Sequence, residues 1–351
     1  MSVNQIKKSW IESEMINNIE DSDEIIIEHP EIMNLINLCI NNDNYKEIIQ
    51  LSDYLCIQNV DPIIDSILKL FDYDFNIISE FENFYKLSKT IAKFENKLEL
   101  IDAVDIWIES PLEAYYIYGC ISYWDVSNVD DMGYLFINCK FNEDISRWDV
   151  SNVKSMNSMF NNSTFNGNIE NWDVSNVIYM IKMFNNSCFN GNIENWDVSN
   201  VMDMSYMFCK SKFDQPIGQW DVSNVDDMNS MFNDSIFNQY IGDWDVSKVQ
   251  NMGYMFDNSI FNQPIGQWDV SNVENMKKMF YQSIFNQPIG QWDVSNVKNM
   301  NYMFRKSNFN QDIRNWDVSN VKTLIAMFQY SPFNYNINNW NVSNVCRNYT
   351  Y

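Results

Sequence analysis

One carboxylate recurs every 24 residues through the C-terminal two-thirds of the chain. The column comprises Asp125, Asp149, Asp173, Asp197, Asp221, Asp245, Asp269, Asp293 and Asp317. Stacked about 5 Å apart, the spacing of neighbouring strands, such carboxylates could hold hard cations, which bind carboxylate and carbonyl oxygens. The alternative is structural, with each Asp accepting a backbone N–H bond from its own turn or helix start. Because no second acidic column runs in register with the first, we favour the structural alternative.

Columns of serine, asparagine and methionine share this period. Serine and asparagine side chains can form hydrogen bonds from one copy to the next, and asparagine also tolerates left-handed turns. Lys248 replaces one asparagine, which argues against a strict ligand role for that column. We interpret the methionine column, which includes Met132, Met156 and Met180, as core packing rather than a metal or redox site.

The sequence lacks the residues of common catalytic sites. His29 is the only histidine, which excludes the usual serine and cysteine triads and histidine-ligated zinc. The patterns GxxxxGK[ST], GxGxxG and GxSxG do not occur, and the seven cysteines include no CxxC pair. We interpret the cysteines as reduced thiols. The sequence therefore predicts a protein that is not an enzyme, with no cofactor and no metal site.

Charge and hydropathy limit the partners. The chain has 23 basic and 47 acidic residues, a net charge of −24 at pH 7. A chain this acidic is not expected to bind nucleic acids, because that binding depends on basic residues that neutralise the phosphates. Binding to anionic lipid is disfavoured for the same reason. The N-terminus has no apolar signal segment, and no run approaches the ~18 apolar residues of a membrane span. We therefore expect an intracellular protein with no nucleic-acid partner and no membrane span.

Ten tryptophans, from Trp124 to Trp340, stand 24 residues apart without an insertion. A strict period of this size indicates stacked repeats. Each unit reads W-D-V-S-N-V-x-x-M-x-x-M-F-x-x-S-x-F-N-x-x-I-x-x. Within the unit, the apolar residues of V-x-x-M-x-x-M-F have the spacing of one to two helical turns. The preceding D-V-S-N contains residue types that cap the starts of helices. The stretch I-x-x-W-D-V is rich in β-branched and aromatic residues, which favours a short strand. We predict ten coils, each with a short strand and a short helical segment.

The repeat is also similar to that of a known family. Segments such as FNQPIGQWDVSNVENMKKMF at 261–280 resemble the BspA-like repeat, also called the mycoplasma surface-protein repeat. Residues 100–123, with Ala103-Val104, Trp107 and Tyr118-Gly119, resemble the lead-in to such arrays. The resemblance implies a leucine-rich-repeat-like solenoid over 124–351 with an N-terminal cap over 100–123. Members of that family are mostly uncharacterised; they occur on bacterial surfaces, where adhesion is the usual suggestion, and in giant-virus and protist proteins.

Residues 1–99 lack the repeat, and we predict a small α-helical domain there. Ile48, Ile49, Leu51 and Leu55 share one helical face. Residues 25–70 resemble the second half of the BTB/POZ and Skp adaptor fold, through the core YKEIIQLSDYLCI that begins at Tyr45. The β-rich first half of that fold has no counterpart in the first 24 residues. This resemblance implies an interaction module of the kind found in ubiquitin-ligase adaptors.

Taken together, the chain is predicted to be α+β, with a helical N-terminal domain followed by the ten-coil solenoid. A binding face should lie where the repeats differ, because the varied outward positions of solenoids are their recognition surface. Neutral drift on solvated positions would leave the same variation. The candidate protein-binding residues are Asp130, Lys154, Ile178, Tyr179, Met202, Asp226, Lys298, Arg147 and Arg314.

These observations predict a non-enzymatic scaffold or adaptor that binds another protein. There are two candidate settings for this binding: recruitment of a substrate to a ubiquitin ligase, and a contact between host and pathogen. The two candidate locations are a host cytoplasm and a virion. The alternative is a structural or surface protein, such as an adhesin or a virion component, in which the repeats form a spacer or a coat. The identity of the partner and the oligomeric state are not predicted.

Overall fold

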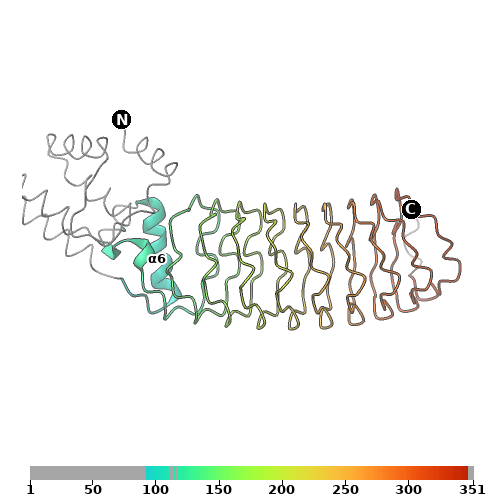
Figure 1. Ribbon diagram of the computed structural model, residues 1–351, viewed down its shortest axis with the longest axis horizontal. Coiled ribbons are helices and arrows are strands. Elements are labelled where there is room, and N and C mark those ends of the chain that lie inside the picture. The colour runs from blue at the N-terminus through green and yellow to red at the C-terminus, as the bar shows by residue number, and fades with distance from the viewer. Residues whose placement is uncertain (1–91, 111–113, 115–116, 347–351) are drawn as a thin grey trace, which may run out of the picture. The chain divides into compact units, whose positions relative to one another are not determined.

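The computed structural model describes residues 92–110, 114 and 117–346, all within the second of two units, Leu87–Tyr351, into which the chain divides. Within this unit, similar coils are stacked along one axis from helix α6 (Lys97–Glu109) toward the C-terminal end (Figure 1). The predicted helical domain, apart from 92–99, and the BTB/POZ–Skp resemblance at 25–70 lie outside the described residues.

Backbone hydrogen bonds set the register between coils at 24 residues. Isolated parallel bridges join equivalent residues of successive coils, from Asp131–Ser155 to Asn299–Thr323. Alternate N–H groups beside these bridges donate to the next coil. For example, the N–H groups of Ser158 and Phe160 donate to the Ile181 and Met183 carbonyls, with N···O distances of 2.8 and 2.9 Å. The coils are therefore held together by main-chain bonds, although these do not form continuous strands.

The predicted α+β solenoid is wrong for the described residues. Their named elements are α6 and the short 3₁₀ helix η2 (Ile121–Tyr123), and neither an α-helix nor a named strand occurs inside a coil. The segment expected to form a strand is closed by a turn, in which the Trp148 N–H donates to the Ile145 carbonyl at 3.1 Å. Each coil is built from turns and irregular backbone.

Residues with positive φ explain why the expected helical segment does not form. Ser158 and Asn162 have φ of 56° and 57°, and positive φ recurs at these two places in every coil up to Ala326 and Tyr330. A right-handed helix needs negative φ at each residue, so it stops there. Bonds between residues three apart close tight turns instead, as from the Met159 N–H to the Met156 carbonyl at 3.2 Å. The M-x-x-M-F spacing thus buries its apolar side chains through consecutive turns.

The core is a set of stacked apolar columns. Trp, Val, Met, Phe and Ile of the repeat are buried through successive coils. The Phe160 ring lies 5.6 Å from that of Phe184 in the next coil, at an interplanar angle of 3°, and 4.3 Å from that of Phe165. The indole N–H of Trp172 donates to the Ile145 carbonyl of the preceding coil at 3.1 Å, so the one polar atom of this large side chain is satisfied in the core.

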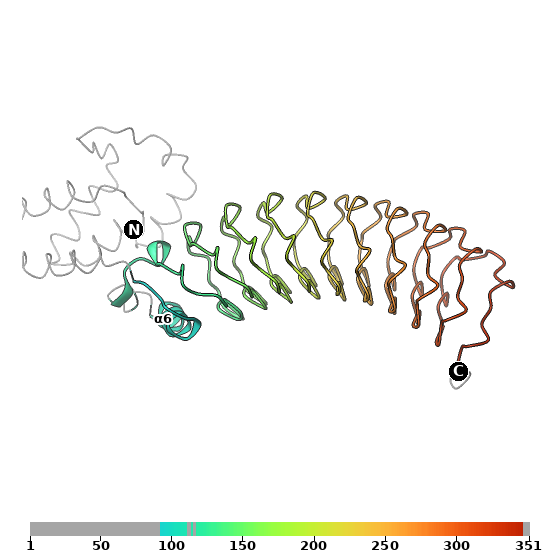
Figure 2. The ribbon, with the colours of Figure 1, turned by 90° about the horizontal axis from the view of Figure 1, so that it is seen from below.

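Helix α6 covers the first coil of the stack (Figure 2). Its N-cap, Asn96, accepts hydrogen bonds from two backbone N–H groups of the first turn, as capping asparagines do. The helix buries Leu100, Ala103 and Val104, while the neighbouring Phe94 ring lies 5.0 Å from that of Trp124. Helix α6 crosses the boundary predicted between residues 99 and 100; the division into domains stays a prediction. None of the helices in the described ranges is long and apolar enough to cross a membrane.

A test of the left-handed positions uses two exposed lysines of the same coil. Lys210 has φ of 56°, whereas Lys212 does not have positive φ. A β-branched side chain clashes with the left-handed backbone, so Lys210→Val should lower the free energy of unfolding by about 1–2 kcal/mol. Lys210→Gly should be neutral or slightly stabilising. Chemical denaturation followed by tryptophan fluorescence measures both.

Lys212→Val is the matched control for this test and should change stability by less than about 0.5 kcal/mol, as surface substitutions usually do. Equal losses in Lys210→Val and Lys212→Val would contradict the assignment of strain to position 210.

Candidate binding surface

The aspartate column is used by the turns of its own coils. The Oδ1 atom of Asp173 accepts from the Ser175 N–H at 3.1 Å and from the Ser175 hydroxyl at 2.6 Å. These two bonds lower the pKa of Asp173 below its usual range, because they favour the charged carboxylate. The structural interpretation of the column is confirmed by these bonds. No cluster of three or more His, Cys, Asp or Glu side chains that could hold a metal ion occurs among the described residues.

The asparagine column ties neighbouring coils together. The amide nitrogen of Asn176 donates to the Ser151 carbonyl of the preceding coil at 2.7 Å, and the same bond recurs along the column. Lys248 departs from this rule, because its Nζ atom donates to the Oδ1 atom of Asn224 at 2.6 Å. The coil-to-coil bonding expected of this column is confirmed, and its side chains form an ordered row on the surface.

Asp197 offers a direct test of the structural role. Its Oδ1 atom accepts from the Ser199 N–H at 3.0 Å, and Asn341 makes the equivalent bond to Ser343 in the last coil. Asp197→Asn keeps an acceptor and should change stability by less than about 0.5 kcal/mol, whereas Asp197→Ala should cost about 0.5–2 kcal/mol. The measurement is the denaturation midpoint with and without millimolar Ca²⁺. A Ca²⁺-dependent rise in the wild type that Asp197→Asn abolishes would instead support a cation ladder.

The predicted face lies mainly in one column. Asp130, Lys154, Ile178, Met202, Asp226 and Lys298 hold the same place in their coils. The N–H groups of Ile178 and Met202 donate to the carbonyls of the equivalent residues one coil earlier, at 2.8 and 2.9 Å. Tyr179 stands beside this column with 43% of its surface exposed. The structure therefore places these residues in one column along the stack, in which Gln250 and Glu274 stand between Asp226 and Lys298.

Part of this column borders an open groove of about 450 Å³. We call it the asparagine groove; its lining residues are Lys154, Asn176, Ile178, Asn200, Met202 and Asn224. Met202, which is 44% exposed, and Ile178 contribute apolar surface, while the asparagine row contributes amide groups. The groove thus combines three residues of the predicted face with the asparagine column, which the sequence had indicated only as structural.

Arg147 and Arg314 do not join this groove. The Arg147 guanidinium lies 4.9 Å from the ring centre of Tyr123. Arg314 forms an ion pair with Asp312 at 2.8 Å, and its hydrogen bonds lower the pKa of that exposed carboxyl to about 2. Each arginine thus contacts a neighbour of its own, and neither lines the groove that contains Ile178 and Met202.

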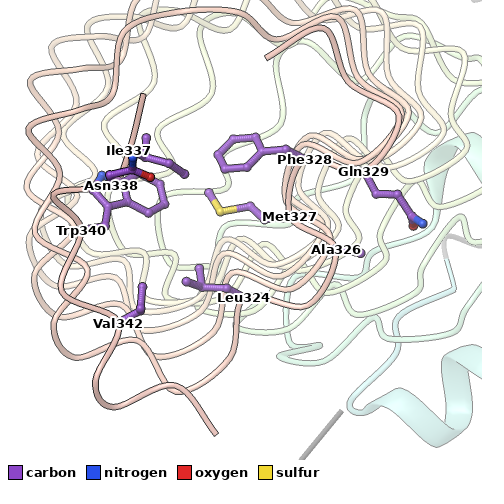
Figure 3. A pocket seen from close by; sticks show the side chains of 9 residues that line it. All are labelled: Leu324, Ala326, Met327, Phe328, Gln329, Ile337, Asn338, Trp340 and Val342. Atoms are coloured by element: carbon purple, nitrogen blue, oxygen red, sulfur yellow. The ribbon is translucent and has the colours of Figure 1, made fainter. Parts of the chain in front are cut away.

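A hollow of about 510 Å³ lies at the last coil of the described stack (Figure 3). Met327, Phe328, Ile337 and Trp340 point into it, whereas Gln329 points away. These inward side chains belong to the columns that the following coil covers everywhere else in the stack. The hollow is therefore a cross-section of the core, and its lining indicates no particular ligand.

A second surface, which the sequence did not predict, is formed by partly exposed residues of the turns. Lysine or arginine side chains lie over tyrosine rings there, as where the Lys182 Nζ atom is 5.1 Å from the ring centre of Tyr206 in the next coil. Such contacts are attractive because a cation meets the negative face of the ring. The available signal was the recurrence of Lys, Arg and Tyr at the variable places of M-x-x-M-F-x-x-S. It was overlooked because that stretch was expected to be a helix.

Asp257 is a buried carboxylic acid in the turns beside this second surface. Only 8% of the residue is exposed, and burial raises the pKa of its carboxyl to about 7; the nearby Lys278 lowers it, and Asp234 raises it further. Asparagine holds the equivalent place in three other coils, at Asn161, Asn185 and Asn233. A carboxylate at this position is therefore an exception that costs stability when it is charged.

The pH dependence of stability tests this assignment. The pKa of Asp257 is higher in the folded state than in the unfolded state, so ionisation of this group lowers the free energy of unfolding. This loss of stability is absent below about pH 4, develops as the pH rises, and is complete above about pH 7. Asp257→Asn should therefore raise the free energy of unfolding by about 1–3 kcal/mol at pH 8 and by much less at pH 4.5. Denaturation curves at both pH values measure the difference. The exposed Glu170→Gln is the control and should show no such trend; a pH-independent effect of Asp257→Asn would contradict the assignment.

The described residues define a class of protein: a repeat protein of stacked, turn-rich coils, whose notable surfaces are rows of side chains shared by several coils. The chain belongs to the family described as Mycoplasma protein of unknown function, DUF285, whose model matches residues 113–213, 185–284, 209–306 and 259–351. No curated protein and no solved structure matches the chain. The expected kinship with a mycoplasma repeat family is confirmed, whereas the BspA-like and BTB/POZ–Skp resemblances stay predictions.

Proposed function

We propose that this chain is a non-enzymatic repeat protein that binds another protein through the asparagine groove. The observation that carries the proposal is that the exposed Met202 and the partly exposed Ile178 line one groove beside an ordered row of amides. Complete burial of such a side chain against a partner contributes about 1.5–3 kcal/mol, and these two are already partly buried, so the groove suits a contact of modest affinity.

The asparagine row would supply specificity to this contact. The amide nitrogens of Asn176 and Asn200 donate within the stack, at 2.7 Å in both cases. Their amide oxygens are therefore the atoms left to accept hydrogen bonds from a partner. The spacing between these acceptors is fixed by the register of the coils, which favours an extended segment that lies along the row.

The cellular setting of this binding remains a further proposal. Recruitment of a substrate to a ubiquitin ligase depends on the resemblance at residues 25–70, and a host–pathogen contact depends on the BspA-like resemblance, which extends to giant-virus proteins. An intracellular location, without a nucleic-acid partner, stays a prediction from the sequence. A structural role, as a spacer or coat, is the alternative; the uninterrupted hydrogen-bond ladder from Asp131 to Thr323 favours it.

Quantitative affinity purification of the full chain from a eukaryotic host tests the proposal. The groove variant carries Ile178→Ser and Met202→Ser. Its control carries Ile236→Ser and Ile260→Ser, which remove two apolar side chains at another place in the coil, each about as exposed as Met202. We expect at least one protein whose recovery falls tenfold or more with the groove variant and is unchanged with the control.

Direct binding of that protein, once purified, should then weaken about tenfold with the groove variant, a loss of about 1.4 kcal/mol. Recovery of the same proteins in equal amounts by the wild type and the groove variant would overturn the role of the groove. A wild-type chain that recovers no partner would favour the spacer or coat alternative.

A further inference from the structure

A compact basic and aromatic surface lies on four successive coils near the C-terminal end of the stack. We call it the basic patch, and it is formed by Lys277, Lys278, Arg305, Lys306, Tyr254, Tyr281, Tyr302 and Tyr330. None of these residues lines the asparagine groove. The patch is therefore a separate surface, and its role is independent of the function proposed for the groove.

The coil register brings the patch together from residues that are far apart in sequence. The Tyr254 N–H donates to the Lys277 carbonyl at 2.7 Å, and the Gln282 N–H donates to the Arg305 carbonyl at 3.0 Å. These main-chain bonds hold neighbouring coils side by side at the places where the basic residues stand. The position of each cation on the surface is therefore fixed by the same ladder that builds the fold.

Tyrosine rings hold the cations in place without neutralising them. The Nζ atoms of Lys277 and Lys278 each lie 5.3 Å from the ring centre of Tyr254, and Lys278 also lies 4.6 Å from that of Tyr281. The Arg305 guanidinium lies 5.3 Å from the ring centre of Tyr302. Each contact of this kind contributes about 0.5–1 kcal/mol at an exposed site. Lys277, Lys278 and Arg305 are thus ordered before any ligand arrives, and Lys306 follows Arg305 directly in the chain.

The cations of the patch form no ion pairs in the part of the chain that the structure describes; the carboxyl of Asp257, whose pKa is raised by burial and lowered in part by Lys278, lies nearby without forming one. Lys277, Lys278, Arg305 and Lys306 take part in none of the ion pairs found there. The buried Nε atom of Arg305 has no hydrogen-bond partner among those residues. A buried donor without an acceptor costs free energy. The chain has 47 acidic residues, yet none of the described ones forms an ion pair with this group. The amino groups of its lysines therefore remain available to an external anion, whereas the buried Nε atom of Arg305 does not.

We propose that the basic patch binds a carboxylate-rich segment of a partner protein. Lysine and arginine side chains provide only donors, and carboxylates are the protein groups that accept charge-assisted bonds from them. The high net charge of the rest of the chain does not prevent this contact, because charges more than about 8 Å apart are largely screened at physiological ionic strength.

The composition and shape of the patch favour an acidic protein segment over a nucleic acid. Binding of a single strand uses a continuous basic track with aromatic faces free for base stacking. Here the tyrosine rings already contact Lys or Arg. The carboxyl of Asp257 lies on the first coil of the patch, near Lys278, and that of Asp234 lies near Asp257 on the preceding coil. A phosphate backbone that followed the turns would meet these acids, whereas a short acidic peptide would not need to reach them.

The test is binding of a fluorescein-labelled decaglutamate peptide to the full chain, measured by fluorescence anisotropy at 50 and 200 mM salt. A decaglutamine peptide is the neutral control. We expect decaglutamate to bind at 50 mM salt, at least tenfold more tightly than decaglutamine, and to weaken at 200 mM. The variant Lys277→Gln, Lys278→Gln, Arg305→Gln, Lys306→Gln should weaken the binding of decaglutamate at least tenfold.

The matched control variant carries Lys140→Gln, Lys210→Gln and Lys212→Gln, which remove exposed charges from turns of other coils. It should keep more than half of the wild-type affinity. Thermal unfolding verifies that each variant is folded. If the quadruple variant is unfolded, the double variant Lys277→Gln, Lys306→Gln replaces it. The double variant should weaken the binding of decaglutamate at least threefold.

Several outcomes would overturn the proposal. The first is equal binding of decaglutamate by the wild type and the patch variant, or no binding by the wild type. The second is an equal loss with the control variant, which would indicate non-specific attraction. The third is tighter binding of a ten-nucleotide oligothymidine, by at least tenfold and through the same four residues, which would assign the patch to nucleic acid.

Discussion

The hydrogen-bond ladder between coils is the constraint on which the structure depends. Alternate N–H groups of one coil, such as those of Ser158 and Phe160, meet carbonyls of the next, and buried backbone groups that lacked such partners would cost free energy. Matching coil to coil requires the same backbone path in each repeat, including the two left-handed residues of every coil. One inserted residue would shift every later bond, which accounts for a period of 24 held without a slip.

The same repeated structure determines which polar side chains are used within the fold and which remain available to bind a partner. The aspartate column is used within its own turns and the asparagine column between coils, so the most regular polar residues of the chain mainly maintain the fold. The two binding roles that we propose therefore depend mainly on the places that vary, such as Ile178 and Met202 in the asparagine groove and Lys277 and Arg305 in the basic patch. The register aligns such residues across coils, which allows a contact to be assembled from single residues 24 positions apart.

Individual residues show why part of this surface could not be predicted. The spacing of Met156, Met159 and Phe160 fits a helical face as well as it fits consecutive turns, because both bring residues three or four apart to one side. One sequence signal distinguished them: Ser158 and Lys182, like the other residues with positive φ, are never β-branched, whereas the neighbouring Ile181 is. Reading the stretch as a helix hid the exposed turn residues that form the basic patch.

The sequence by itself determined the period, the apolar columns of the core, the structural use of the aspartates and membership of a mycoplasma repeat family. These follow from residue type and spacing, which one chain displays directly. Only the tertiary structure decided that the coils contain turns in place of a helix and a strand, and which variable residues share a surface. The reason is physical: each N–H group could bond within its own coil or to the next, and only the neighbouring coil determines which bond forms.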